Sequence, residues 1–577
     1  MASLNGAVAP SEFPPPVDSV KEFIKRGLDP EDDRIEVGVA IVGGGTAGLS
    51  CANRLLQLLS DDPATMERLG EVPVAVIEKA KTCGGHSLSG AVMRPGPLQE
   101  LFPHFSREDW RRERFAFGEV KKEAVYMLPN ARMKLRLPVP PNFSNHGNEI
   151  VSVSAMGRFQ QRQAEEGGAY VLTETAATQL IVQDGQVVGV RSGDKGRGKD
   201  GQPLSNFEPG TDIKAAVTVL AEGCWGHLTG AAIREFDLAD GREPQVWELG
   251  AKEVWKVRQP LDRVIHTLGP WPLKLARKYG QIGGTWLYPM TDGKSGDDLV
   301  SIGFVVDLDY RDATTSAHDL LQLFKTHPFV RGILDGGERV AWGAKALPGG
   351  GYWSMPKLSM PGALLVGDAG GMVDTAALKG IHHCIKSGSL AAEAIYKHLK
   401  GESPLSPYEE AIESSSVGKE LYEMRNARQP LSKGFIQGFP MSGLSIVSKG
   451  KLPPGRLQWH RDDEEPLFIG DTYKSYPKAD GKYTFDKLSS VYVSGNATRD
   501  DAPNHIRVHR HVPREIAEGW RWMCPAGVYE IPEDAPQSGP VDVIVNYTNC
   551  VQCGAITAKG GRLTPPEGGD GPLYTLA

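Results

Sequence analysis

The chain lacks several features that would assign it quickly to a class. It has no run of 18 or more uninterrupted apolar residues, so no segment is long enough to span a bilayer as a helix. Positive charge is not in excess, since the formal net charge is −7, which argues against a nucleic-acid-binding protein. Repeats and low-complexity tracts are absent as well.

Two further absences concern targeting and disulfides. The first residues have neither a charged stretch followed by an apolar core nor an Arg-rich amphipathic pattern, so a signal or transit peptide is not indicated. The seven cysteines are odd in number and are not spaced as a disulfide framework. Four of them, Cys51, Cys83, Cys224 and Cys384, stand in apolar or glycine-rich settings typical of small buried side chains.

What is present is a globular chain with a nucleotide-binding signature. The 577 residues are 40% hydrophobic, which is enough for a large core and two to four domains. An apolar run at 37–42 predicts a buried parallel strand, and Gly43, Gly45 and Gly48 follow it before an apolar helical pattern. These glycines permit a tight turn, close approach of a pyrophosphate, and close packing of helix on strand. The helix N-terminus would face the phosphates.

A second strand at 74–77 ends in Glu78, whose carboxylate is suited to accept hydrogen bonds from ribose hydroxyls. The acid comes later than the usual spacing, and we attribute the delay to an inserted polar loop at 60–71. The alternative is a glycine turn in an unrelated α/β protein.

Two later segments indicate a flavin. The stretch at 84–91 is glycine-rich, follows the second strand, and is placed to lie along a flavin; an ordinary loop is the alternative. A strand from 362 ends at Gly367 and Asp368, where a carboxylate can bind ribityl hydroxyls, and a helix is predicted from about Gly380. The candidate residues in these segments are Gly85, His86, Ser89, Gly90, Gly367, Asp368 and Gly380.

Inside that helix, His382 and His383 are adjacent. Neighbouring residues of a helix point to different faces, so we interpret this pair as packing or flavin-side polar groups rather than as metal ligands. Elsewhere, a helix is predicted at 151–167, and strands with an Asp-Gly turn at 169–191. The polar residues 193–201 are predicted to be a surface loop, and 240–345 an antiparallel sheet.

Residues 431–470 are apolar and aromatic but are interrupted by glycine and proline. This segment is a candidate for dipping into a lipid interface, with Lys433, Lys449, Lys451 and Arg456 near anionic headgroups. A buried connector is the alternative.

The last three cysteines, Cys524, Cys550 and Cys553, lie together in a glycine-rich tail with few strand signals. A Cys-Pro dipeptide and a C-x-x-C suit thiolate ligation of an iron–sulfur cluster. Zinc would need a fourth ligand that the tail does not offer nearby, and a thioredoxin-type motif would leave Cys524 without a role. A tail without metal is the remaining alternative.

Over nearly its full length the chain resembles the electron-transfer flavoprotein–ubiquinone oxidoreductase family. The motifs that carry the resemblance are long and occur in order. They stand at 43–50, 86–91, 145–148, 221–227, 283–288, 303–310, 477–481, 485–491, 524–530, 549–553 and 566–572.

The resemblance implies a Rossmann-type α/β FAD-binding domain, an interleaved α+β quinone-binding domain and a C-terminal ferredoxin-like iron–sulfur domain. A lead at 1–35 would precede them, and a membrane-associating connector at 431–470 would join the iron–sulfur domain at 471–577. The expected FAD-binding segments are about 36–115, 210–240 and 350–430, and the expected quinone-binding segments are about 116–209 and 241–349. Gly283 and Gly284 match the family's quinone-contacting pair.

The resemblance also implies FAD, one 4Fe–4S cluster, a reduced electron-transfer flavoprotein as donor, and ubiquinone or menaquinone as acceptor. Attachment to the membrane would be monotopic. Without a transit signal we expect the cytoplasmic face of a bacterial inner membrane, or the mitochondrial inner membrane in a eukaryote. An FAD-dependent reductase or monooxygenase of the geranylgeranyl-reductase type is the enzymatic alternative, and an electron-carrier subunit the non-enzymatic one.

One departure concerns the cluster. The family's last cysteine segment reads C-x-x-C-x-x-C, whereas Ile556 stands at the third position here. Isoleucine cannot ligate iron, so three thiolates would hold a 3Fe–4S cluster, or a 4Fe–4S cluster with another fourth ligand, or the cluster would be lost.

Overall fold

The computed structural model describes residues 7–90, 92–224, 226–290 and 298–576. Its larger sheet is built around β2 (Arg34–Val42), the strand before the glycine turn. The strands run in the order β1-β10-β11-β14-β2-β3-β9, with β21 on β14 and β20 on β21. Their bounds are β1 (Ile24–Arg26), β3 (Val74–Ile77), β9 (Tyr170–Leu172), β10 (Ala177–Gln183), β11 (Gln186–Ser192), β14 (Asp212–Leu220), β20 (Ser359–Met360) and β21 (Ala363–Leu365).

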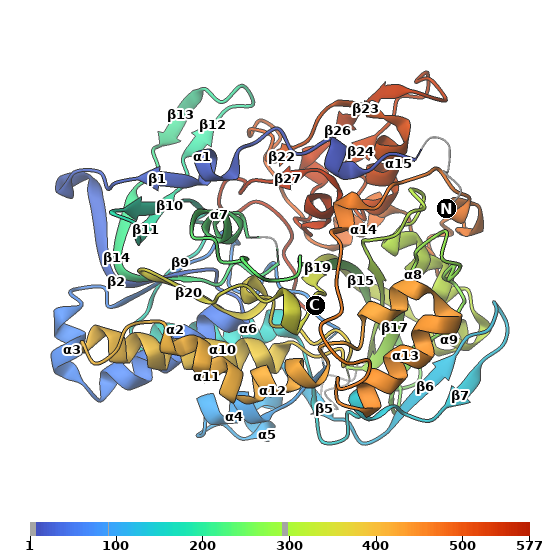
Figure 1. Cartoon of the computed structure of the whole chain (residues 1–577), viewed down its shortest axis with the longest axis horizontal. Coiled ribbons are helices and arrows are strands. Elements are labelled where there is room, and N and C mark those ends of the chain that lie inside the picture. Colours follow the sequence, from blue (N-terminus) through green and yellow to red (C-terminus); the bar gives the residue numbers. More distant parts are fainter. Residues whose placement is uncertain (1–6, 91, 225, 291–297, 577) are drawn as a thin grey trace.

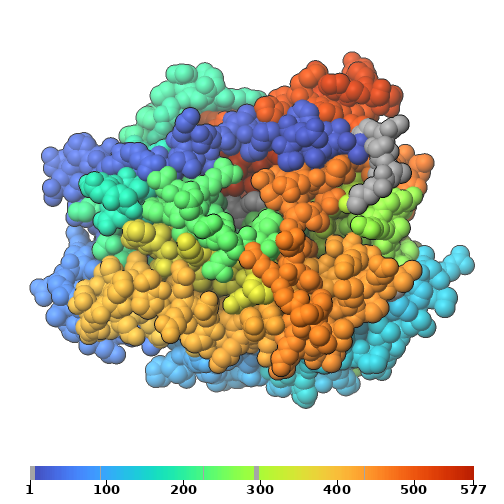
Figure 2. All heavy atoms as spheres, viewed as in Figure 1, coloured from blue at the N-terminus to red at the C-terminus, as the bar shows by residue number. Residues whose placement is uncertain are grey.

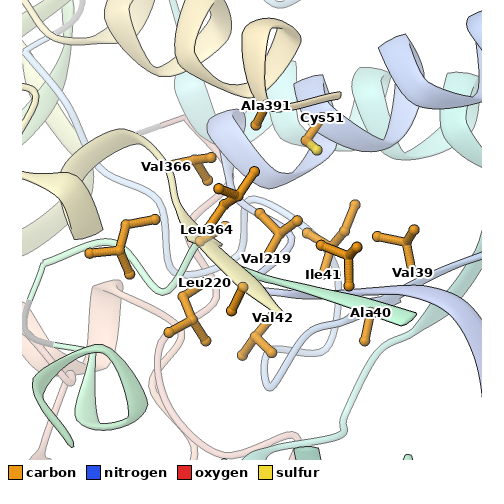
Figure 3. Packing of buried hydrophobic residues seen from close by; sticks show 14 of the residues in the cluster. Val39, Ala40, Ile41, Val42, Cys51, Val219, Leu220, Leu364, Val366 and Ala391 are labelled. Carbon is orange, nitrogen blue, oxygen red and sulfur yellow. The ribbon is translucent and has the colours of Figure 1, made fainter. Parts of the chain in front are cut away.

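Burial explains why the centre of this sheet reads as continuous apolar runs. The last six residues of β2 and all four of β3 are buried, as parallel strands covered on both faces require. Figure 3 shows Ile41, Val219 and Leu364 of neighbouring strands packing beneath Cys51 and Ala391. The last two residues belong to the covering helices α2 (Thr46–Ser60) and α10 (Ile381–Leu399).

The smaller sheet is the antiparallel sheet expected at 240–345, and Figure 1 shows it on the opposite side of the molecule from α2 and α3. Its seven strands run in the order β19-β15-β18-β17-β16-β6-β7, and the pair β16–β6 is parallel. Their bounds are β6 (Glu123–Met127), β7 (Leu135–Leu137), β15 (Trp247–Val257), β16 (Val264–Leu268), β17 (Gly283–Pro289), β18 (Asp298–Asp307) and β19 (Glu338–Pro348).

The expected division of the chain needs one correction. Strands β9, β10 and β11, which we had assigned to the quinone-binding part, pair in the larger sheet with β3, β1 and β14. Alternating hydrophobicity identifies a strand but not the sheet that it joins. The expected lead also contributes to this sheet, because β1 pairs in parallel with β10.

Local predictions were mostly confirmed. Helix α6 (Val153–Glu166) and the Asp184-Gly185 hairpin, whose two residues have positive φ, are present. Two expected loops carry structure instead: 60–71 contains α3 (Pro63–Arg68), and 193–201 opens a hairpin of β12 (Lys195–Arg197) and β13 (Pro203–Glu208). Pro63 at the first position of α3 is in fact a typical helix-start residue, whereas the charged residues of the hairpin resemble a loop.

The other elements surround the two sheets. The remaining helices are α1 (Ser19–Phe23), α4 (Gly96–Leu101), α5 (Arg107–Arg112), α7 (His227–Glu235), α8 (Ala317–Lys325), α9 (Pro328–Leu334), α11 (Pro407–Ser414), α12 (Ser416–Glu423), α13 (Phe435–Val447), α14 (Lys487–Val493) and α15 (Arg514–Met523). The short strands are β4 (Val92–Met93), β5 (Ala116–Glu119), β8 (Glu149–Val151), β22 (Ile506–Arg507), β23 (His511–Pro513), β24 (Tyr529–Glu530), β25 (Pro540–Asp542), β26 (Ile544–Val545) and β27 (Arg562–Leu563). No helix in the described ranges is long and apolar enough to cross a membrane.

The tail packs on the smaller sheet. Buried side chains of both, including Trp342 of β19 and Trp520 of α15, form one hydrophobic cluster. The tail's strands are two or three residues long, as its sequence indicated. Packing therefore places the cysteine segment against β19, which borders the larger sheet's cavity.

Candidate active site

A cavity opens where strands of the larger sheet end and face the smaller sheet. Val42, Ala221 and Val366, which follow or end β2, β14 and β21, line it from one side. Trp286 and Tyr288 of β17 line it from the other. Ligands in open α/β sheets bind at this carboxyl edge of the strands.

Most residues predicted to bind FAD line this cavity, but three do not. These three are Gly48, Gly85 and Gly367. Gly48 packs against the glycine turn, and the neighbouring residues Gly84 and Asp368 line the cavity in place of Gly85 and Gly367. Ala91 and Trp225, within two of the motifs, lie outside the described residues. The predicted residues that line the cavity are Gly43, Gly45, Glu78, His86, Ser89, Gly90, Asp368 and Gly380.

The glycine turn has the geometry that a pyrophosphate needs. Gly43 has a φ of 109°, and a Cβ there would lie 2.3 Å from the Ala221 carbonyl oxygen, so only glycine fits. A Cβ at Gly45 would meet nothing within 4 Å, because this residue faces the open cavity. Helix α2 begins at the next residue, Thr46, and presents its N-terminus there.

Glu78 is held at the end of β3 by the backbone. Its two carboxylate oxygens accept hydrogen bonds of 2.7 Å from the Gly44 and Ala80 N–H groups. This fixed carboxylate is suited to ribose hydroxyls. Beside it, burial and the Lys345 charge lower the pKa of Lys79, which also lines the cavity, to about 8.

Asp368 and the start of α10 form the far wall. Asp368 belongs to a short 3₁₀ segment (Gly367–Gly370), and burial raises its pKa above the usual value. The Cys384 thiol donates to Asp368 Oδ1 at 3.4 Å. Gly380 caps α10 and lines the cavity, so the positive end of this helix faces the space beside Asp368.

The prediction that His382 and His383 diverge is wrong. Both Nε2 atoms meet Glu420 Oε2, at 2.9 and 3.0 Å, because the side chains bend toward α12 from adjacent positions. His383 Nδ1 also faces the Met372 carbonyl oxygen at 3.2 Å. These contacts bring three potential ligand atoms, one each from His382, His383 and Glu420, within 4.8 Å of one another.

Sequence reasoning missed the aromatic wall of the cavity, although the strand period could have identified it. Side chains alternate along β17, so Gly284, Trp286 and Tyr288 share one face and Gly283 lies on the other. Neither glycine of the expected quinone pair lines the cavity, but Gly284 lies on the face that does. The Tyr288 hydroxyl lies 2.7 Å from His266 Nε2, and burial together with Lys379 lowers the pKa of His266 to about 3.

The tail brings its three cysteines together among hydrogen-bond donors. Ala526 and Val528 N–H groups donate to Cys524 Sγ at 3.5 Å, and the Gln552 N–H donates to Cys550 Sγ at 3.4 Å. Burial and the three thiols raise the pKa of Tyr529 well above its usual value, so this ring lies close to all of them. N–H donors around buried thiols suit thiolate ligands of an iron–sulfur cluster.

The thiol spacing does not suit a single zinc ion. Tetrahedral ligation at the usual Zn–S distance puts the sulfurs about 3.8 Å apart. Among the described residues, the three thiols do not all lie within 4.8 Å of one another. The group that meets this criterion is His382, His383 and Glu420.

Strand β19 joins the cysteine segment to the cavity. The Ala346 N–H donates to the Cys553 carbonyl oxygen at 2.8 Å, and Lys345 Nζ donates to the Gln552 carbonyl at 3.2 Å. Lys345, Gln552 and Gly554 all line the cavity. The residues on both sides of Cys553 are therefore part of the cavity wall, which no local sequence signal indicated.

Comparisons with known proteins agree with this geometry. The family model described as ETF-QO, ubiquinone-binding, matches residues 247–347, and the one described as electron transfer flavoprotein-ubiquinone oxidoreductase, 4Fe-4S, matches residues 481–575. The chain is 37% identical to the electron transfer flavoprotein-ubiquinone oxidoreductase of Caenorhabditis elegans, over 93% of this chain and 91% of that protein. For the Homo sapiens protein the identity is 36%, over 95% and 90%.

Solved structures with the same fold are more distant. A geranylgeranyl bacteriochlorophyll reductase-like protein from Thermoplasma acidophilum aligns with a TM-score of 0.52 at 18% identity, over 73% of this chain and 93% of that one. A myxobacterial FAD-dependent halogenase aligns with a TM-score of 0.50 at 17% identity, over 78% and 99%. At this identity the similarity shows the fold alone.

Proposed function

Because the chain belongs to the electron transfer flavoprotein–ubiquinone oxidoreductase family, we propose that it passes electrons from a reduced electron-transfer flavoprotein to ubiquinone. Its cofactors are FAD and an iron–sulfur cluster, and the cavity and the three thiols described above fit them. The observation that carries the proposal is that Gln552 and Gly554, which flank Cys553, form part of the cavity wall. Electrons would thus pass between two adjoining sites inside one protein.

The bound FAD and cluster supply the one-electron chemistry, and the chain's own residues position them and keep water away. The glycine turn and Glu78 would hold the dinucleotide end of FAD, and Asp368 the ribityl chain. Lys345 places its ammonium group on the strand between the cavity and the cysteine segment. The positive charge of Lys345 would favour the reduced, more negative state of the FAD on one side and of the cluster on the other.

We assign the quinone to the side of the cavity lined by β17. Trp286 and Tyr288 offer flat apolar surfaces, and the absence of a side chain at Gly284 leaves room on the same strand face. Reduction of a quinone to a quinol consumes two protons. The Tyr288 hydroxyl can donate one hydrogen bond to a quinone oxygen while His266 holds the tyrosine in place.

We further propose that α13 attaches the protein to a membrane surface. Its Ile436, Leu444 and Val447 are 87%, 50% and 76% exposed, which is unusual for aliphatic side chains. Met133, just before β7, and Leu135, the first residue of β7, are also about half exposed. Figure 1 shows the hairpin of β6 and β7 on the same side of the view as α13. The space-filling view in Figure 2 shows the α13 region at the molecular surface.

The basic residues expected near headgroups divide into two pairs. Lys449 and Arg456 form ion pairs with Glu423 and Glu243, whereas Lys433 and Lys451 are exposed near the two ends of α13. The exposed pair would face anionic lipids. The identity of the membrane depends on the organism that the chain comes from. The names of the Caenorhabditis elegans and Homo sapiens relatives describe them as mitochondrial.

Vesicle flotation tests the attachment. The Ile436→Glu and Val447→Glu double variant should lose binding to phosphatidylcholine vesicles that contain phosphatidylglycerol, because two charges would enter the apolar interface. Tyr170→Glu, at a residue 59% exposed on β9, is the matched control and should still bind. Equal binding by both variants would contradict the role of α13.

The function itself is tested with purified protein, dithionite-free reduced electron-transfer flavoprotein and a soluble ubiquinone analogue. We expect quinol to form in proportion to the flavoprotein oxidised. A menaquinone analogue is tested in the same assay for comparison. A reductase of the geranylgeranyl type shares the fold only. It would instead reduce a prenyl double bond and leave quinone unchanged, which would overturn the proposal.

A further inference from the structure

The ligand set in the tail is one short of what a 4Fe–4S cluster uses. Such clusters take four cysteine thiolates, and the tail supplies Cys524, Cys550 and Cys553. The other four cysteines of the chain lie outside the tail. Cys51 and Cys83 lie in the core of the larger sheet, and Cys384 packs against that core. Cys224 lines the cavity, near enough to Cys553 for the two thiols to interact electrostatically.

Hydrocarbon occupies the position three residues after Cys553. Ile556 is 3% exposed and lies in a short 3₁₀ segment (Ala555–Lys559). A Cβ placed on Gly561 would come within 2.4 Å of Ile556 Cγ1 and 2.8 Å of Val508 Cγ1, so these three residues pack tightly together. Ile556 therefore contributes to the packing of the tail and offers no atom that can bind iron.

Hydrogen-bond donors around the thiols show that the site still suits an anionic cluster. The Ala526 and Val528 N–H groups donate to Cys524 Sγ at 3.5 Å, and the Gln552 N–H donates to Cys550 Sγ at 3.4 Å. Lys345 Nζ also reaches this segment, where it donates to the Gln552 carbonyl oxygen at 3.2 Å. The tail thus keeps the surroundings of a cluster while lacking one ligand.

We propose that this chain binds its cluster through three thiolates only, with the fourth corner next to Ile556 left without a protein ligand, so that the isolated protein holds a 3Fe–4S cluster. On reduction the cluster would take up a ferrous ion. The balance is one 3Fe–4S cluster of charge +1, one electron and one Fe²⁺ giving one 4Fe–4S cluster of charge +2. This inference rests on the proposed function only in naming the cluster as an electron carrier.

The fourth iron would be exchangeable, because no protein thiolate retains it. The electron-accepting site would then depend on the supply of ferrous iron and on oxidants, unlike a site with four thiolates. One competing ligand is the Thr557 hydroxyl, which is buried and has no hydrogen-bond partner in the described part of the chain. The other is the Cys224 thiol, which interacts electrostatically with Cys553. A test must separate these arrangements from an open fourth corner.

The experiment uses the full-length holoprotein, purified without added iron. Iron and sulfide are counted per FAD, and low-temperature EPR is recorded before and after dithionite, with and without ferrous ammonium sulfate. We expect about three irons and about four sulfides per FAD. The EPR signal of the oxidised protein should disappear on reduction, and ferrous iron should then convert the cluster to the four-iron form.

Four variants complete the test. Ile556→Cys should hold about four irons through purification without added iron, whereas Ile556→Val, which keeps the apolar packing, should remain at about three. Thr557→Val and Cys224→Ala should each keep the iron content of the parent protein. Four tightly held irons in the parent, lost in either of these two variants, would overturn the proposal in favour of that residue as the fourth ligand.

Iron counts and EPR do not depend on turnover, so the two proposals fail separately. A protein with about three irons that does not reduce quinone would refute the proposed function and leave the cluster assignment intact. A protein that reduces quinone but holds four irons in every variant, or none, would refute the cluster assignment alone.

Discussion

The FAD cavity and the cysteine tail lie on either side of β19, yet they depend on different parts of the chain. The cavity is shaped by backbone: glycines at the turn, strand ends, and N–H groups that hold Glu78. The tail instead offers three side chains as ligands, the thiols of Cys524, Cys550 and Cys553. A side chain at Gly43 would collide with the Ala221 backbone, so the turn requires glycine there. In the tail, replacing one cysteine would change the ligand set without a change of backbone.

The largest effect should come from filling the cavity at the turn. Gly45→Phe places a ring where the dinucleotide would lie, and overpacking of about 1–3 kcal/mol corresponds to a roughly 5- to 150-fold loss of FAD affinity. Flavin absorbance after desalting measures it. Gly96→Phe is the matched control, since a Cβ there also meets nothing within 4 Å and the residue lies away from the cavity. Iron content should be unchanged in both variants.

Removing a tail ligand should produce the reverse pattern. Cys550→Ser should retain FAD and lose the cluster, with iron falling below about a tenth of the parent value, because a site with two thiolates holds a cluster poorly. Iron analysis and flavin absorbance are measured on the same sample. Cys51→Ala, in α2 and remote from the tail, should keep its iron. Loss of both cofactors from Cys550→Ser would show that the two sites are not separable.

A smaller effect is expected where the two sites meet. Lys345→Met removes the positive charge between them, and a loss of about 1 kcal/mol lowers a two-electron flavin potential by about 20 mV. Spectroelectrochemical titration measures the shift. Lys345→Arg keeps the charge and should keep the potential. An equal shift in both variants would mean that Lys345 acts through packing rather than charge.

The smallest effect concerns the connector that leads from the cavity to the tail. Burial raises the pKa of Glu465, but hydrogen bonds from His460 and Arg311 outweigh it and hold that pKa at about 2. A carboxyl with a lowered pKa stabilises the fold above its unfolded value of about 4.5, and this contribution is lost as the pH falls toward 2.

Glu465→Gln should therefore lower the free energy of unfolding by about 1–2 kcal/mol near neutral pH, and by less at about pH 4. Urea titrations at the two pH values measure the difference. Glu402→Gln, whose carboxylate pairs with Lys400 at an exposed position, is the control and should change stability little at either pH. A penalty that is independent of pH would point to packing instead.

Several elements were predictable because their signals are local. The run at 37–42, the glycine turn and the helix after it follow from steric rules that neighbouring residues obey whatever surrounds them. The cysteine spacing likewise indicated a cluster before the tail's fold was known. The family motifs extended these predictions to the whole chain, and the comparisons confirmed the family.

Other features depend on contacts between distant residues. Nothing local assigned β9 to β11 to the larger sheet, since any strand with an apolar face can pair with several partners. The convergence of His382 and His383 on Glu420 arises from the packing of α12 beside α10. Trp286 and Tyr288 alternate as in any half-buried strand, and only the position of β17 makes them a cavity wall.

By itself the sequence indicated the dinucleotide turn, the three candidate thiolate ligands and the isoleucine at the family's remaining cysteine position, because each depends on the identity of particular residues. The tertiary structure decided that the cysteine segment and the FAD cavity share β19, and that Lys345 lies between them. The reason is physical: a strand's partners are chosen by burial of its two faces and by hydrogen bonds to residues far along the chain.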